Sequence, residues 1–242
     1  MKMYKKVMAA ALAGVMTVSM SATAFAADDD GYILKATNED SKSSDNDLVI
    51  AIEGSVSSMD PANIPDTNAI SATRGVYETL VSFDENQELT GKLAEAWEVS
   101  DDSLTYTFKL RQGVKFQDGT DFNAAAVKAN YDRVVNKDNN LRQRRTFIVT
   151  NEDGSETPRV DSIETPDDYT LVIKLTQAWA PFINRLTQFC IISPAALEEY
   201  GNDIMNHPCG TGPYVCTEWE EGDHTSSSAM MITGETNRAL TL

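Results

Sequence analysis

Alternation of apolar and polar residues predicts the clearest strand of the chain at residues 104–110. Every second residue from Leu104 to Leu110 is apolar, whereas threonine and lysine occupy the positions between them. A period of two is typical of a strand with one buried side. Two similar runs, 160–163 and 170–175, predict a pair of strands joined by a turn at 166–168.

Helical spacing alternates with further short apolar runs along the chain. Asn123 is a suitable N-cap for a helix, and Pro194 is suited to the first turn of another. The predicted helices are 69–80, 124–135, 181–187 and 195–200. The predicted additional strands are 48–52, 189–192 and 214–219, and 151–155 is predicted as a loop. Strands and helices are interspersed without internal repeats, so the predicted class is mixed α/β.

The first 26 residues have the three-part pattern of a secretory signal peptide. Lys2, Lys5 and Lys6 precede an uncharged apolar run at 7–20, and Ala24-Phe25-Ala26 supplies small residues for cleavage. The run of about 14 residues is short for a membrane-spanning helix of about 20, which leaves a membrane anchor as the weaker alternative. We therefore expect export to the periplasm or the outer face of the cytoplasmic membrane. The acidic, Ser/Asn-rich residues 27–46 are predicted to form a flexible linker.

The charge balance restricts the partners of the chain. The 242 residues include 20 Lys and Arg and 37 Asp and Glu, for a net charge of −17. Removal of residues 1–26 would take away three lysines and no acidic residue, leaving −20. Such a surface repels phosphate backbones and anionic lipids, so nucleic acid is not an expected partner.

Candidate catalytic and metal-binding residues lack a recognised spacing. His207 and His224 lie near Cys209 and Cys216, but their separations match no usual zinc pattern. No G-x-S-x-G elbow is present. We expect no metal, no cofactor and no nucleophilic catalysis. The chain has three cysteines, of which Cys209 and Cys216 form a candidate disulfide, with buried free thiols as the alternative.

Three other groups are candidates for ligand contact. Gly210-Thr211-Gly212-Pro213 allows close backbone approach, either to a ligand or at a crossing between domains. Arg142, Arg144 and Arg145 offer a carboxylate clamp, or else a solvated helix face. The aromatic residues Trp179, Phe182 and Phe189 belong either to a pocket or to the core.

Residues 93–133, LAEAWEVSDDSLTYTFKLRQGVKFQDGTDFNAAAVKANYDR, resemble the hallmark stretch of the extracellular solute-binding protein family 5. These proteins are the peptide- and nickel-type binding components of ABC importers. Four further pieces resemble the family in the same order, and together the resemblance covers 48–219. They are Ser58-Met59-Asp60-Pro61, YETLV at 77–81, TLVIKLTQAWAPF at 170–182 and PCGTGPY at 208–214.

This resemblance implies a type II, periplasmic-binding-protein-like bilobed fold that closes on its ligand. The first lobe would comprise 47–80 and 207–223, with a small α/β domain inserted at 81–206. Only the first lobe and the inserted domain would then be present. The loop at 210–213 would return the chain to the first lobe.

The implied function is capture of a small solute, most simply an oligopeptide or dipeptide, and its delivery to an ABC permease by a monomeric binding protein. The resemblance places Ser58, Met59, Asp60, Trp179, Phe189 and Gly210 to Pro213 near the ligand. Arg142, Arg144 and Arg145 would suit a peptide carboxylate. Two alternatives stay open: an exported hydrolase, and a surface interaction module without a transport role.

The chain departs from the family pattern after residue 223. The family continues with R-N-x-x-Y-W-G, whereas this chain reads HTSSSAMMITGETNRALTL. With suitable codons, reading Thr225 onward from its third base yields I-I-L-R-N-D-D-Y-W-G. We therefore expect a frameshift near His224, an aberrant tail at 224–242 and low stability of the chain. Sequencing of the gene beyond codon 224 tests this expectation.

Overall fold

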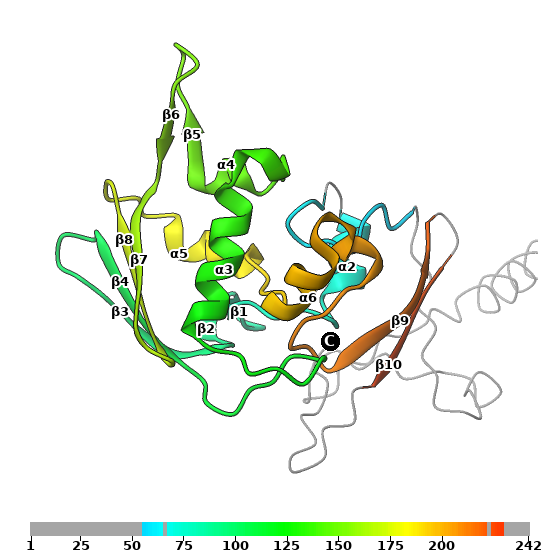
Figure 1. The fold of residues 1–242 in the computed structure, drawn as a ribbon. Coiled ribbons are helices and arrows are strands. Elements are labelled where there is room, and N and C mark those ends of the chain that lie inside the picture. Colours follow the sequence, from blue (N-terminus) through cyan, green and yellow to red (C-terminus); the bar gives the residue numbers. More distant parts are fainter. Residues whose placement is uncertain (1–54, 65–66, 222–223, 230–242) are drawn as a thin grey trace, which may run out of the picture. The chain divides into compact units, whose positions relative to one another are not determined.

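A four-stranded antiparallel sheet in the order β3-β4-β8-β7 is the widest sheet among the residues that the computed structural model describes, 55–64, 67–221 and 224–229 (Figure 1). These residues belong to one compact unit, Ile52–Leu242. The predicted signal peptide at 1–26, linker at 27–46 and strand at 48–52 lie outside the described residues.

Alternating side chains form the buried face of this sheet. Its strands are β3 (Ala94–Val99), β4 (Thr105–Leu110), β8 (Thr170–Leu175) and β7 (Val160–Asp167). Phe108 lies opposite Leu171 in the ladder, and neither is exposed. The predicted strands at 104–110, 160–163 and 170–175 are confirmed, as is the pairing of the last two, which is antiparallel. Strand β7 extends to Asp167, so the connecting turn is 168–169 and not 166–168 as predicted.

Helix α3 (Ala124–Val135) packs beside this sheet and contacts β7 (Figure 1). The Asn123 side chain accepts a hydrogen bond of 2.9 Å from the Ala126 amide, which confirms the predicted N-cap. Helix α6 (Pro194–Tyr200) has proline in its first turn, as predicted, and Ser193 as its N-cap. The predicted helix at 181–187 divides into α5 (Phe182–Arg185) and the 3₁₀ turn η3 (Leu186–Gln188).

The remaining helical segments are short. They are α2 (Thr67–Thr73), η2 (Lys137–Asn139), α4 (Arg144–Phe147) and η4 (Gly201–Asn206). The prediction of helix throughout 69–80 is wrong beyond Thr73. The Thr73 hydroxyl bonds back to the Ala69 and Ile70 carbonyls at this end of the helix, and the chain enters strand β1 at Val81.

The predicted strand at 189–192 is also wrong. A single antiparallel bridge joins Thr79 and Cys190, and the Ile191 amide bonds to the Glu78 carbonyl. At the next residue, the Ile192 amide donates to the side-chain oxygen of Asn130, and the Ile192 carbonyl accepts from the side-chain nitrogen of Asn130. This side chain therefore replaces the strand neighbour that a longer ladder would need.

Three two-stranded ribbons complete the described fold. They pair β1 (Val81–Phe83) with β2 (Leu89–Gly91), β5 (Ile148–Thr150) with β6 (Glu156–Pro158), and β9 (Tyr214–Glu220) with β10 (His224–Ala229). The loop at 151–155 and the strand at 214–219 are confirmed. Strand β10 includes the first six residues of the expected aberrant tail. Its pairing with β9 uses backbone groups, which every residue except proline carries in full.

Candidate functional site

Two segments far apart in the sequence, residues 75–77 and residues 210–214, lie against each other and are joined by backbone hydrogen bonds. We call this contact the glycine crossing. The Gly212 amide donates to the Val76 carbonyl at 2.9 Å, and the Tyr214 amide donates to the Gly75 carbonyl at 3.0 Å. A Cβ added at Gly210 or Gly212 would overlap backbone atoms of this earlier segment. Both glycines are thus explained by close backbone contact within the protein.

Thr211, between these glycines, is directed inward. It is 9% exposed, and its hydroxyl donates to the Glu78 carboxylate at 3.0 Å. Pro213 is exposed. Of the four residues of this loop, Pro213 is therefore the one whose side chain is open to solvent.

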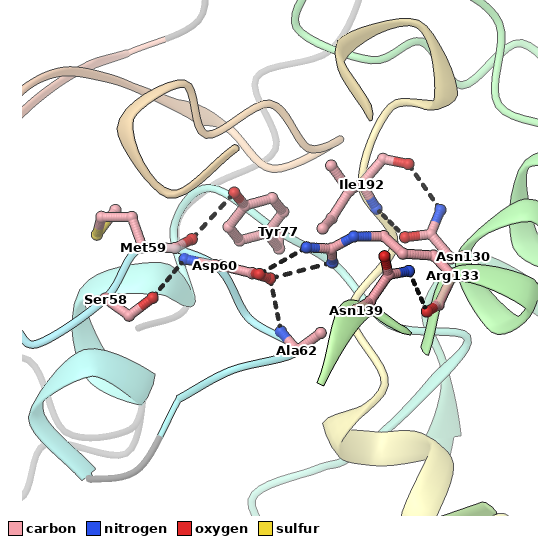
Figure 2. A network of polar contacts seen from close by, with 9 residues as sticks. All are labelled: Ser58, Met59, Asp60, Ala62, Tyr77, Asn130, Arg133, Asn139 and Ile192. Atoms are coloured by element: carbon pink, nitrogen blue, oxygen red, sulfur yellow. Dashed lines mark hydrogen bonds and ion pairs between the residues drawn. The ribbon is translucent and has the colours of Figure 1, made fainter. Parts of the chain in front are cut away.

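Ser58, Met59 and Asp60 form a second buried centre (Figure 2). The Ser58 hydroxyl accepts from the Asp60 amide at 3.1 Å, and the Met59 carbonyl accepts from the Tyr77 hydroxyl at 3.1 Å. Met59 is fully buried, and Ser58 and Asp60 are each 5% exposed. Burial and the nearby Asp60 carboxylate raise the pKa of Tyr77 well above its ordinary value, so its proton is retained for this bond.

The Asp60 carboxylate is bound by an arginine of helix α3. Arg133 donates to its two oxygens at 3.2 and 2.6 Å, in the fork geometry typical of arginine and carboxylate. The same carboxylate accepts a third hydrogen bond, of 3.0 Å, from the Ala62 amide (Figure 2). Asp60 thus joins the early segment to the helix and does not present its charge to solvent.

Sequence reasoning missed Arg133 and its neighbour Asn130 on the same helix. Asn130 is 3% exposed, and it exchanges bonds of 2.7 and 3.0 Å with the backbone of Ile192. One signal was present in the pattern. Asn130 lies on the helix stripe of Val127 and Val134, where a polar residue needs an internal partner.

The two aromatic residues expected near a ligand contact different aromatic rings. Trp179 is partly buried, contacts Phe182, and stacks under the Arg159 guanidinium at 4.0 Å. Phe189 is 3% exposed and packs edge-on against Phe147. Only Trp179 of this pair keeps an accessible surface of any size.

The three arginines proposed as a carboxylate clamp, Arg142, Arg144 and Arg145, differ in their contacts. Arg144 binds both oxygens of Glu156 at 2.7 and 2.8 Å and also donates to the Val135 carbonyl. Arg142 and Arg145 are exposed, and neither forms an ion pair within the described residues. The carboxylate that this cluster clamps is therefore one of the chain's own.

All three cysteines are free thiols, so the candidate Cys209–Cys216 disulfide is wrong and the alternative of free thiols holds. The two thiols have different neighbours: Cys209 lies against Asp118, and the Cys216 thiol points to the Glu218 carbonyl at 3.5 Å. Burial raises the pKa of Cys190 to about 12 and that of Cys209 to about 11.

A shallow hollow of about 270 Å³ lies between α3 and α6. Its lining includes Arg133 and Glu198, and none of the residues expected at the ligand. Among the described residues, no three His, Cys, Asp or Glu side chains are grouped as metal ligands. No helix in this part of the chain has the length and apolar character needed to cross a membrane.

Comparison with known proteins identifies the family. Residues 88–229 match the family described as bacterial extracellular solute-binding proteins, family 5 Middle. The chain belongs to this family. The matched residues include the four-stranded sheet, helix α3, the loop at 210–213 and strand β10.

Relatives of known specificity and structure place the chain within family 5. The glutathione-binding protein GsiB of Salmonella typhi is 42% identical over 179 residues, 73% of this chain and 33% of that protein. AgaA of A. tumefaciens R10, solved with agropinic acid, has a TM-score of 0.65 and 27% identity over 73% of this chain and 34% of its own. DppA of Helicobacter pylori, solved with the peptide STSA, has a TM-score of 0.58 and 29% identity over 72% and 37%.

The mixed α/β fold is therefore that of a part of the periplasmic binding proteins, as expected from the resemblance. The chain spans about a third of the length of these family 5 relatives.

Proposed function

We propose that this chain acts in solute capture outside the cytoplasmic membrane, as part of the binding component of an ABC importer, and catalyses no reaction. The observation that carries the proposal is the family 5 match over residues 88–229. The proposed partners are a small ligand and a membrane permease. The proposed domains are 47–80 with 207–223 for the first lobe and 81–206 for the inserted domain, in a monomer exported by residues 1–26.

A peptide-like ligand is the best-supported class. A glutathione-binding protein is 42% identical to this chain, and DppA, solved with the peptide STSA, shares its fold. Glutathione is itself a short peptide with two carboxylates. The exposed Arg142 and Arg145 are suited to bind such a group, because each guanidinium offers a planar set of donors.

The proposed site residues divide by accessibility. Trp179 and Pro213 have surfaces that a ligand can contact, and we assign them direct contact. Ser58, Met59, Asp60, Phe189, Gly210, Thr211 and Gly212 are buried and would shape the wall behind them.

Uptake by intact cells tests this function. We expect disruption of the gene to abolish uptake of labelled glutathione or of the labelled peptide STSA, and the wild-type gene to restore it. Restoration with a Trp179→Leu gene should give uptake with an affinity lowered at least about tenfold. Trp97→Leu is the matched control, because Trp97 lies on the separate strand β3.

Unchanged uptake of both compounds in the disrupted strain would overturn the proposal. Peptide cleavage by the purified chain would support the hydrolase alternative. Stable attachment of the chain to the cell wall, without an effect on uptake, would support the interaction module.

A further inference from the structure

Gln117 lies in a tight loop directly beside the crossing of residues 75–77 and 210–214. The Phe116 amide bonds to the Thr120 carbonyl across this loop, and Lys115 and Asp121 form an isolated bridge at its base. The Gln117 side chain is partly buried and points into the crossing. Neither the family match nor the predicted site residues assign a role to it.

The amide group of Gln117 binds both crossing segments at once. Its Nε2 lies 3.2 Å from the Val76 carbonyl of the earlier segment, and 3.1 and 2.6 Å from the Gly212 and Tyr214 carbonyls of the later segment. Its Oε1 accepts from the Gly210 amide at 3.2 Å. The Gln117 backbone amide adds a bond of 2.9 Å to the Gly210 carbonyl.

These bonds supply what the crossing backbone needs. The glycines bring the two segments too close for side chains to lie between them, so their backbone groups depend on a few partners. A primary amide is the one neutral side-chain group that both donates twice and accepts. The Gln117 side chain therefore hydrogen-bonds to both carbonyl and amide groups of the crossing without placing a charge there.

The neighbouring residue fixes the position of this loop. Asp118 accepts hydrogen bonds from the Ser193 hydroxyl, which caps α6, and from the Thr120 hydroxyl at 2.6 Å. Burial by itself raises the pKa of Asp118, but these hydrogen bonds outweigh it and the pKa is lowered. The carboxylate thus stays ionised at neutral pH and anchors the loop that carries Gln117.

We propose that Gln117 is a positioning residue that holds the two crossing segments as one mechanical unit. This inference rests on the proposed function, because both crossing segments belong to the proposed first lobe, which has to move as one body when a binding protein closes on its ligand. With Gln117 in place the two segments move together. Without it, each segment moves separately, and the orientation of the parts that they join is no longer fixed.

Hydrogen exchange of the ligand-free chain tests this proposal, and its result does not depend on the ligand. In a Gln117→Met chain, we expect exchange of the Gly212 and Tyr214 amides to accelerate at least about tenfold. These amides bond to the other segment and not to Gln117, so they report coupling between the segments. Amides of Phe108 and Ile173, in the sheet, should keep their rates.

Gln112→Met is the matched control, because Gln112 is exposed and close in sequence. Unchanged exchange at Gly212 and Tyr214 would overturn the proposal, and so would an equal acceleration at Phe108 and Ile173, which indicates general destabilisation. Gln117→Asn retains the amide on a shorter side chain that does not reach the carbonyls. The same comparison on this variant decides the question if the Met variant does not fold.

Discussion

Two arginine–carboxylate forks in this molecule have nearly the same geometry and very different surroundings. Arg133 binds Asp60 at 2.6 and 3.2 Å, and Arg144 binds Glu156 at 2.7 and 2.8 Å. The side chains of the first pair are 11% and 7% exposed, and those of the second are 18% and 30% exposed. The first joins residues 73 apart in sequence, and the second joins residues 12 apart, next to a hairpin.

Because the two pairs share a geometry and differ in burial, we expect them to contribute differently to stability. A buried charge that loses its partner keeps its full desolvation cost, whereas an exposed charge is hydrated again by water. The Asp60–Arg133 pair should therefore be sensitive to loss of either partner, and the Arg144–Glu156 pair should tolerate it.

The largest expected effect follows loss of Asp60. Asp60→Ala leaves the Arg133 guanidinium buried without its carboxylate, and we expect the free energy of unfolding to fall by about 3–5 kcal/mol. Urea denaturation measures this loss. The matched control is Asp161→Ala, since Asp161 is 55% exposed in its ion pair with Lys174.

A double variant makes this test specific for the unpaired charge. Asp60→Ala combined with Arg133→Leu should be more stable than Asp60→Ala alone, because no charge is left buried. Equal stability of the single and double variants would contradict this account of the buried pair.

Loss of the buried, uncharged hydrogen bonds between Asn130 and Ile192 should lower the free energy of unfolding by an intermediate amount. Asn130→Ala removes the partners of the Ile192 amide and carbonyl, and we expect a loss of about 2 kcal/mol in unfolding free energy. Asn202→Ala, at an exposed asparagine, is the control. If Asn130→Ala cost as much as Asp60→Ala, burial rather than charge would explain the first result.

Glu156→Gln should have a small effect on stability at neutral pH, measured as a thermal midpoint. The bond from Arg144 lowers the pKa of Glu156, yet the pair is open to water and salt. We expect added salt to diminish the difference between this variant and the wild type. Glu152→Gln, on the adjoining loop, is the matched control. A destabilisation as large as that of Asp60→Ala would refute the contrast between the two forks.

The smallest expected effect is the pH dependence of the difference in thermal midpoint between the wild type and Glu156→Gln. Because the folded-state pKa of Glu156 is below its ordinary value, its contribution is present above the ordinary pKa of about 4.3 and is lost as the pH falls through the lowered value. The melting curves of the wild type and Glu156→Gln should therefore converge at acidic pH. A gap that widens on acidification would show the opposite sign of linkage.

The elements set by local pattern were predictable from the sequence. The alternation in β4 and the Asn123 cap of α3 depend on residues within one element, and both predictions are confirmed. The Asp60–Arg133 pair was not predictable, because no local rule relates residues 73 positions apart. Arg144 was noticed as a carboxylate ligand, but the sequence did not reveal that Glu156 already occupies it.

The free cysteines of this chain are natural probes of local opening, because their reactivity depends on their exposure. Burial raises the pKa of both Cys190 and Cys209 far above neutral pH, so nearly all of each thiol is protonated. The thiolate is the form that attacks alkylating reagents and disulfides, so these protonated, buried thiols react slowly in the folded chain. We expect alkylation of Cys209, which is followed directly by Gly210, to accelerate when the region beside the glycine crossing opens.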